Sequence, residues 1–363
     1  MRNKVLLVFL ALILAAVPLL AACAPPAPPP APPPPAPPAP PPPAPPPAPP
    51  KPIILTFANF PPAPTFPCVS MERWADEVEK RTNGRVSIMT FPGQTLLTVP
   101  AMFDGVLAGV ADIGVSCPSY EPGRFPLIVS METPGITYPN TTVASRVLWE
   151  VVQEFQPESL ARFKVLHMYT AGLNHICTID PVRTLEDLQG LELRAAGALV
   201  PIVKALGAVP IAMPMSALPE ALAKGVVDGY ISSDDVLMDF KFAEIVKYRT
   251  DWSPSIGCSF AVVMNKPAWH ALPADVQKVI DDLALEQSVW TGEYMDKHCA
   301  EALEWAIKEQ GLEVITISPA EKARWDEAIE PVTDACLADL AAKGLPGEEY
   351  LAKLAELCEL YGK

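Results

Sequence analysis

A proline-rich tract limits where this chain of 363 residues can fold. Between residues 24 and 52, 21 of the 29 residues are proline. Proline has no backbone N–H to donate and its ring restricts φ, so we expect a polyproline II segment rather than a helix or a sheet. At about 3.1 Å per residue this segment spans at most about 90 Å. Packed domains must therefore come from the roughly 310 residues that follow, which suffice for two domains of ordinary size.

The residues before this tract have the pattern of an export signal. Arg2 and Lys4 precede a long apolar run that ends in small residues. The sequence LAAC, which ends at Cys23, resembles a bacterial lipobox. We therefore predict a signal peptide over 1–22 and, over 23–52, a lipidated cysteine with a stalk. An ordinary signal with a chance cysteine is the alternative. The first interpretation places an exported module at the outer face of the bacterial cell membrane, held by its lipid.

The charge and the cysteines exclude several partners. The formal net charge is −15, from 42 acidic and 27 basic residues, and no basic stripe is present, so nucleic acid and anionic membrane surfaces are poor partners. Seven cysteines follow Cys23, dispersed and without a C-x-x-C motif, which argues against zinc. In an exported protein some of them can pair, but an odd number leaves at least one free, and spacing does not reveal the pairing.

Strand-like and helix-like apolar patterns alternate from residue 53 onward. We predict strands followed by helices in two successive series: strands 53–60, 85–91 and 111–117 with helices 69–84 and 99–110, then strands 190–195, 209–213 and 228–232 with helices 198–207 and 216–226. Segments 106–116 and 221–232 can also be superposed with one inserted residue, although so short a match can arise by chance. The order predicts an α/β fold with mostly parallel sheets in two similar lobes.

A long helical pattern follows the second series. After a strand at 260–264, helical periodicity runs from Pro273 to Gly311, which are typical first and last residues of a helix. Its length exceeds about 50 Å, so an unbroken helix must lie across both lobes. A strand at 312–318 and two further helices, 319–342 and 347–360, complete the prediction.

The sequence carries little that indicates catalysis. The four histidines lack metalloprotease spacing, and no nucleophile elbow, P-loop or dinucleotide-binding motif is present. Only His175 lies near a predicted crossing between the lobes. We therefore predict no enzyme and no cofactor.

The sequence instead favours a binding cleft. In open α/β sheets ligands bind beyond the carboxyl ends of the strands. Arg194 occupies such a position, and a guanidinium there can hold a carboxylate by two charge-assisted hydrogen bonds. The alternative is a structural ion pair with Glu192 or Asp228, and the residues alone favour neither interpretation.

Three segments indicate a family. The runs TLEDLQGLELRAAG, LGAVPIAMPMSALPEALAKGVVDGYISS and NKPAWHALPADVQKVIDD resemble the DctP-like extracytoplasmic solute receptors of tripartite ATP-independent periplasmic (TRAP) transporters. The resemblance extends from residue 53 to about residue 341. It implies a two-lobed type II periplasmic-binding-protein fold, with helices on both faces of each mixed, mostly parallel sheet and a long helix across both lobes. We assign 53–171 and 258–297 to lobe I, and 172–257 and 298–363 to lobe II.

The resemblance also implies the site residues. The carboxylate-clamping arginine of the family falls on Arg194. A second arginine that many members carry falls on Asn174, and a polar contact that is often asparagine falls on Ser232. The expected ligand contacts are Arg194, Asn174, Ser232 and Asp234, with Phe60, Phe66, Tyr120, Tyr169 and Met213 as the wall. Some members hold a metal near the segment matching 233–235, but two acidic residues are weak support for one, and we predict none.

These residues predict a receptor that captures an organic acid between its lobes and delivers it to a TRAP permease. The missing second arginine favours a monocarboxylate with an apolar or aromatic body over a sugar acid or a dicarboxylate. Two alternatives are a sensory receptor for a membrane kinase and a secreted enzyme.

Overall fold

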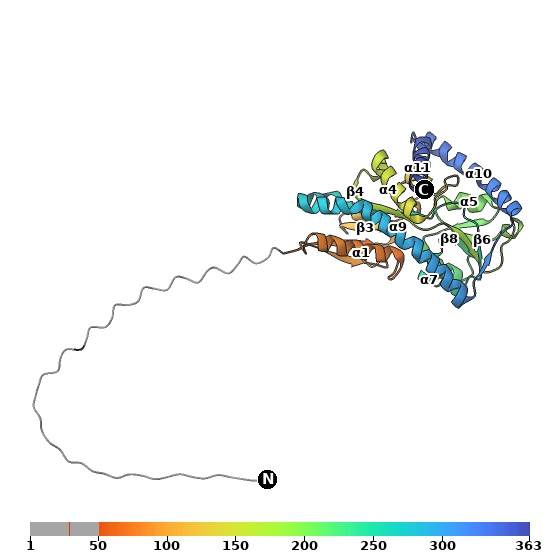
Figure 1. Cartoon of the computed structure of the whole chain (residues 1–363), viewed down its shortest axis with the longest axis horizontal. Helices are drawn as coiled ribbons and strands as arrows, with labels where there is room; N and C mark the ends of the chain where they lie inside the picture. Colours follow the sequence, from red (N-terminus) through yellow and green to blue (C-terminus); the bar gives the residue numbers. More distant parts are fainter. Residues whose placement is uncertain (1–28, 30–50) are drawn as a thin grey trace, which may run out of the picture. The chain divides into compact units, whose positions relative to one another are not determined.

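The computed structural model describes residue 29 and residues 51–363 (Figure 1). The predicted signal peptide, Cys23 and most of the predicted stalk lie outside the described residues. Within residues 51–363 every helix is too short or too polar to cross a membrane.

The first sheet has five strands in the order β2-β1-β3-β10-β4. Strands β1 and β3 are parallel neighbours, whereas β10 runs antiparallel between β3 and β4. Every residue of β10 is buried, as expected for a central strand covered on both faces. The strands are β1 (Ile53–Asn59), β2 (Val86–Phe91), β3 (Ile113–Ser116), β4 (Phe163–Thr170) and β10 (Ser259–Asn265).

The second sheet has six strands in the order β11-β9-β5-β8-β6-β7. Here β5 is the strand that runs antiparallel to both of its neighbours, β8 and β9. The strands are β5 (His175–Thr178), β6 (Glu192–Ala195), β7 (Val209–Ala212), β8 (Gly229–Ser232), β9 (Tyr248–Thr250) and β11 (Glu313–Ile315).

Two strand-to-strand connections cross between the sheets, and residues 266–312 later lead from β10 of the first sheet to β11 of the second. The chain leaves the first sheet after β4 to enter the second as β5, and it returns after β9 to enter the first as β10. The two crossing segments are joined where Gly257 donates its N–H to the carbonyl of Gly172, and Ala171 donates to that of Cys258. Each of these two connections thus supplies the antiparallel strand of the sheet that it enters.

Helices cover both sheets. Three helices pack against strands β1–β3 and β10: α1 (Phe66–Arg81), α2 (Met102–Leu107) and α8 (Lys266–Ala271). Helix α4 (Thr141–Phe155) packs against β4. A short helix, α3 (Pro126–Val129), precedes α4. The second sheet lies between two apolar clusters, one with α5 (Leu199–Ala205) and α10 (Pro319–Ala342), the other with α6 (Leu218–Ala223) and α7 (Asp235–Asp239).

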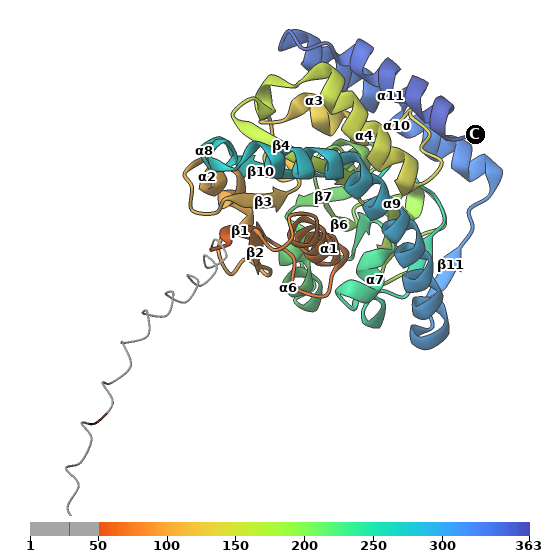
Figure 2. The same cartoon turned by 60° about the vertical axis from the view of Figure 1, so that its left-hand side comes forward.

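The predicted long helix is present. Helix α9 (Ala274–Gln310) has 37 residues and ends at Gly311, which takes the left-handed conformation with φ 71°. It packs against α1, α4 and β4 of the first lobe and against α7 of the second (Figure 2). A single rigid element therefore supports both lobes.

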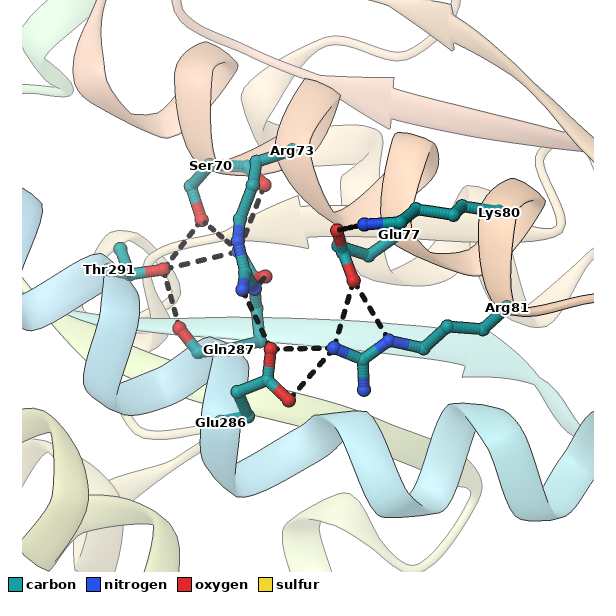
Figure 3. A network of polar contacts seen from close by, with 8 residues as sticks. All are labelled: Ser70, Arg73, Glu77, Lys80, Arg81, Glu286, Gln287 and Thr291. Carbon is teal, nitrogen blue, oxygen red and sulfur yellow. Dashed lines mark hydrogen bonds and ion pairs between the residues drawn. The ribbon is translucent and has the colours of Figure 1, made fainter.

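A polar network fastens α1 to α9 (Figure 3). The amide of Gln287 donates to the carbonyl of Ser70, 3.0 Å away, and Ser70 shares a 2.8 Å hydrogen bond with Thr291. Outside this buried part, Glu286 pairs with Arg73 at 2.8 Å and with Arg81 at 2.7 Å. These buried hydrogen bonds provide partners for the polar side chains of Gln287 and Thr291, which α9 buries against α1.

The C-terminal helix packs against a different lobe from the one to which it was assigned. Helix α11 (Gly347–Tyr361) lies in 298–363, the range assigned to lobe II, but it packs against α4 (Figure 2). Its apolar residues Tyr350, Leu354 and Leu357 join the core of the first sheet. The place of this helix is set by the apolar surface that it covers and not by its position in the sequence.

Gly292 offers a test of the packing between α9 and α4. A Cβ at this position would lie 2.6 Å from Cα of Thr142 and 2.7 Å from the carbonyl oxygen of Thr141, both backbone atoms. We expect Gly292→Ala to lower the free energy of unfolding in urea by about 2 kcal/mol, because the clash outweighs the better helix propensity of alanine. The exposed neighbour substitution Glu293→Ala should change it by less than about 0.5 kcal/mol. A Gly292→Ala protein as stable as the parent would show that the helices separate at little cost.

Candidate functional site

The two sheets present their carboxyl-terminal strand edges to a shared cleft. β3 and β4 end beside the start of β10, with Ser259 opposite Thr170. In the second sheet β8 ends beside the start of β5, with His175 opposite Ser232. Residues that follow parallel strands and residues that begin antiparallel strands therefore meet in the same place.

Tyr120 lies between two hollows of this cleft. It belongs to the 3-10 turn η2 (Pro118–Tyr120), which follows β3. A hollow of about 630 Å³ on one side is lined by η2, the residues after Arg194, the loop at Met213 and α10. A hollow of about 40 Å³ on the other side is lined by both lobes, including Phe60, Phe66, Tyr120, Phe260, Met215, Ser232, Asp235, Asp239 and Phe240.

Arg194 is buried at the end of β6, with 3% of its surface exposed. Its Nε donates to the carbonyl oxygen of Met213 at 3.0 Å, and one terminal nitrogen lies 3.4 Å from the hydroxyl of Tyr120. Within residues 51–363 no ion pair reaches this guanidinium: Glu192 is exposed, and the Asp228 carboxylate accepts from the backbone N–H of Glu192 instead. The structural ion pair that we considered as the alternative is therefore not formed.

A buried guanidinium with neutral partners indicates an anion from outside the chain. Removing a charge from water without a counter-charge costs several kcal/mol, which an incoming carboxylate can offset through charge-assisted hydrogen bonds. Tyr120 bridges the lobes at this point, because its hydroxyl also accepts from the backbone N–H of Met215 at 3.2 Å. A ligand on Arg194 would thus lie where the lobes touch.

Aromatic rings form the first-lobe side of the smaller hollow. Phe60 packs edge-on against Tyr120 with centroids 5.6 Å apart, and it stacks on Phe260 at 6.2 Å. Phe66 meets the edge of Phe260 at 5.3 Å. Such rings offer flat apolar contact with defined geometry. Tyr169 lies behind them, stacked on Phe260 at 5.0 Å and 1% exposed, so it supports this wall without lining the hollow.

The predicted polar contacts divide into two groups. Ser232 lines the smaller hollow, and Met213 lines the larger one. The Asn174 amide instead donates to the carbonyl of Ile256 at 2.6 Å and to Ser255, so it fastens the two crossing segments to each other. Arg194, Asn174 and Asp234 line neither hollow, and Tyr120, which lies 3.4 Å from Arg194, lines both.

Asp234 forms a buried two-pronged ion pair with Arg249 of β9. The two Asp234 oxygens lie 2.9 and 3.0 Å from Nε and a terminal nitrogen of Arg249, and both side chains are under 10% exposed. His175 Nε2 lies 3.7 Å from the same carboxylate, and burial lowers the pKa of this histidine. The Asp234 carboxylate is thus already bound to side chains of its own lobe.

We expect Asp234→Asn to lower the free energy of unfolding by about 3 kcal/mol, because it leaves the buried Arg249 without its two-pronged partner. The matched control is Asp251→Asn, which removes the other carboxylate on Arg249, 2.9 Å away and 53% exposed. The control should lose less than about 1 kcal/mol in the same urea titrations. Equal losses would mean that burial of the pair does not matter.

Two acidic residues near the cleft are held toward their neutral form. Burial raises the pKa of Glu132 to about 7, against hydrogen bonds from Ser119 and Ser259 that lower it. Burial raises the pKa of Asp235, and the neighbouring Asp239 carboxylate adds to this shift. Gly197 packs closely here, since a Cβ on it would lie 3.2 Å from a Glu132 oxygen. Neutral acids at this point would not repel an anion that approaches Arg194.

The raised pKa of Glu132 predicts a pH effect on stability. Because the folded chain holds this proton more tightly than the unfolded chain does, the stabilisation is complete below about pH 4.5 and is lost as the pH rises through about 7. We expect the parent to lose about 2 kcal/mol or more relative to Glu132→Gln between pH 5 and pH 8, measured by urea unfolding. Glu330→Gln, at an exposed glutamate, serves as the control. A parent-to-variant difference that stays constant over this range would contradict the assignment.

Asp239 was not predicted and connects three elements. One of its oxygens accepts from the backbone N–H of Phe66 at 3.0 Å, and the other lies 2.8 Å from Nε2 of His298 on α9. The hydrogen bond to Asp239 raises the pKa of His298. Asp239 therefore joins the start of α1 in the first lobe to α7 and α9.

Phe260 and Phe240 also line the wall, although their positions in the sequence did not predict it. The carboxyl-end rule finds residues that follow parallel strands, whereas Phe260 lies near the start of the antiparallel β10. Recognition of the segment after residue 250 as a crossing would have identified it. Phe240 follows the five-residue helix α7, too short to show a period.

The fold and the cleft define a two-lobed α/β ligand-binding protein. The model of the family described as "Bacterial extracellular solute-binding protein, family 7" (DctP) matches residues 57–339, and the chain belongs to this family. A TRAP periplasmic solute-binding protein from Desulfovibrio salexigens, solved as an open complex with the C-terminus of a symmetry mate in its ligand-binding site, is 46% identical. The alignment covers 85% of this chain and 96% of that one, with a TM-score of 0.76.

Two other relatives bind different acids. A TRAP solute-binding protein from Rhodoferax ferrireducens, in complex with copurified benzoate, is 28% identical over 85% of this chain and 98% of its own, with a TM-score of 0.81. The 2,3-diketo-L-gulonate-binding periplasmic protein YiaO of Escherichia coli is 28% identical over 68% of this chain and 76% of its own. The predicted fold class and the predicted place among the solute receptors of TRAP transporters are confirmed.

Proposed function

We propose that this receptor binds an organic monocarboxylate with an apolar or aromatic body. The observation that carries the proposal is Arg194, buried at the cleft without a counter-charge in the described chain. A carboxylate on its free donors would supply that charge. The position of the second family arginine holds Asn174, whose amide is occupied by Ser255 and Ile256, so a second carboxylate finds no matching cation there.

The walls favour a flat apolar body. Phe60, Phe66, Phe240 and Phe260 surround the smaller hollow, and Tyr120 lies between this hollow and Arg194. We expect the ligand to displace Tyr120 and to place its ring among these side chains, with Ser232 as the hydrogen-bonding residue of the second lobe. The benzoate complex of the Rhodoferax relative supports this ligand class.

Delivery to the membrane follows from the two lobes. A ligand that contacts Arg194 and Ser232 of the second lobe and Phe60, Phe66 and Phe260 of the first favours the closed arrangement, which a TRAP permease would recognise. Lipidation at Cys23 and the stalk up to residue 52 would keep the receptor near that permease. The division into lobe I (53–171 and 258–297) and lobe II is part of this proposal, with α11 moved to lobe I.

The test is calorimetric titration of the purified chain with benzoate, benzamide and succinate. We expect benzoate to bind and the uncharged benzamide to bind at least about 100-fold more weakly, because hydrogen bonds to a charged group are worth about 1.5–3 kcal/mol each. Arg194→Met should weaken benzoate binding by a similar factor. The control Arg183→Met changes an exposed arginine of the second lobe and should leave the affinity unchanged.

Two outcomes would contradict parts of the proposal. Benzoate affinity of Arg194→Met within about threefold of the parent would remove Arg194 as the carboxylate site. Tighter binding of succinate than of benzoate would overturn the monocarboxylate class while leaving the receptor assignment intact.

A further inference from the structure

Two thiols meet beneath the cleft. Cys117 follows β3 and Cys258 precedes β10, and their sulfur atoms are 3.4 Å apart. The antiparallel pairing explains the contact, because Ala261 lies opposite Ser116 and the start of β10 therefore lies beside the end of β3. Among the seven cysteines of residues 51–363, this is the only pair whose thiols contact each other.

The two cysteines differ in access. Cys117 is fully buried, whereas Cys258 is partly exposed and lines the smaller hollow. A disulfide bond has an S–S distance of about 2.05 Å, so the sulfurs need to approach by a little over 1 Å. The family is extracellular, and disulfides form and persist in oxidising extracytoplasmic compartments.

We propose that Cys117 and Cys258 form a disulfide when the exported chain meets a small-molecule or protein disulfide as oxidant. The thiol of Cys258, accessible from the cleft, attacks the oxidant and forms a mixed disulfide, releasing one thiol. The sulfur of Cys117 then attacks that of Cys258, and its proton passes to the departing thiolate. In total the two protein thiols lose two electrons and two protons, and the oxidant is reduced to two thiols.

Accessibility sets the order of these steps. Burial is the largest of several causes that raise the pKa of Cys117. Its thiolate is therefore scarce, and its exchange with a dissolved oxidant is slow. Cys258 faces the hollow and reacts first. Cys117 needs only to reach a sulfur that is already in contact with it.

The disulfide would connect the crossing segment that contains Cys258 to the turn η2, which carries Tyr120. Cys258 accepts a backbone hydrogen bond from Ala171, where the two crossing segments are joined. Cys117 immediately precedes η2, which carries Tyr120. A disulfide between them ties the return crossing to the turn that touches Arg194, so that both move with the first lobe.

Peptide mapping of the purified full-length chain tests the pairing. The chain is treated with oxidised glutathione, alkylated and digested without reductant, and we expect a linked peptide pair that contains Cys117 and Cys258, lighter by about two hydrogen masses than the two thiol peptides together. Its melting temperature should exceed that of the reduced chain by roughly 5 °C, because the bond closes a long loop.

Three variants serve as controls. Cys117→Ser and Cys258→Ser should each lose the linked peptide and the reductant-dependent shift, whereas Cys336→Ser, on α10, should keep both. Full alkylation of Cys117 and Cys258 after the oxidant would overturn the proposal, as would a bond from either of them to another cysteine. If a serine variant does not fold, the peptide map of the parent still decides.

Discussion

The pair of strand-to-strand crossings between two sheets is the constraint on which the rest of the structure depends. Because β5 and β10 each enter the opposite sheet as its antiparallel strand, neither lobe is a continuous stretch of sequence. The crossings place the carboxyl ends of the parallel strands of both lobes around one cleft. They also explain why α9, with 37 residues, packs against both lobes. The long helix and the crossing segments, which are hydrogen-bonded to each other at Gly172 and Gly257, connect the two lobes.

The cleft combines one cation with neutral surroundings. Arg194 lies among a carbonyl, a tyrosine hydroxyl and small residues, and burial raises the pKa values of Glu132 and Asp235. Two further carboxyl groups already have partners: Asp234 pairs with Arg249, and Asp239 pairs with His298 and accepts from the N–H of Phe66. Such an arrangement attracts an anion because the competing anions are either neutralised or already bound. In the proposed complex the phenylalanines would select the ligand by shape.

Local patterns predicted much of the fold but not the crossings. The strands near 53–59, 86–91 and 229–232, the helix 274–310 and the C-terminal helices all lie where periodicity, proline and glycine indicated. Strands β4, β5 and β9 were not predicted, because a strand that crosses between lobes shows no βα alternation of its own. Arg194 could be singled out from its place at a strand end. Arg249 could not be identified as the partner of Asp234, because it lies 15 residues away on a strand that was not predicted.

The sequence by itself determined the classes of structure: an α/β region with one long helix, and an arginine at a strand end without an obvious partner. These follow from backbone chemistry and from periodicity, which act over a few residues. Only the tertiary structure decided which groups meet. Among residues 51–363 it left Arg194 without a carboxylate and paired Asp234 with Arg249. It also used Asn174 to connect the two crossing segments and brought Cys117 beside Cys258. Contacts between residues distant in sequence depend on the path of the chain between the sheets, and no local pattern encodes that path.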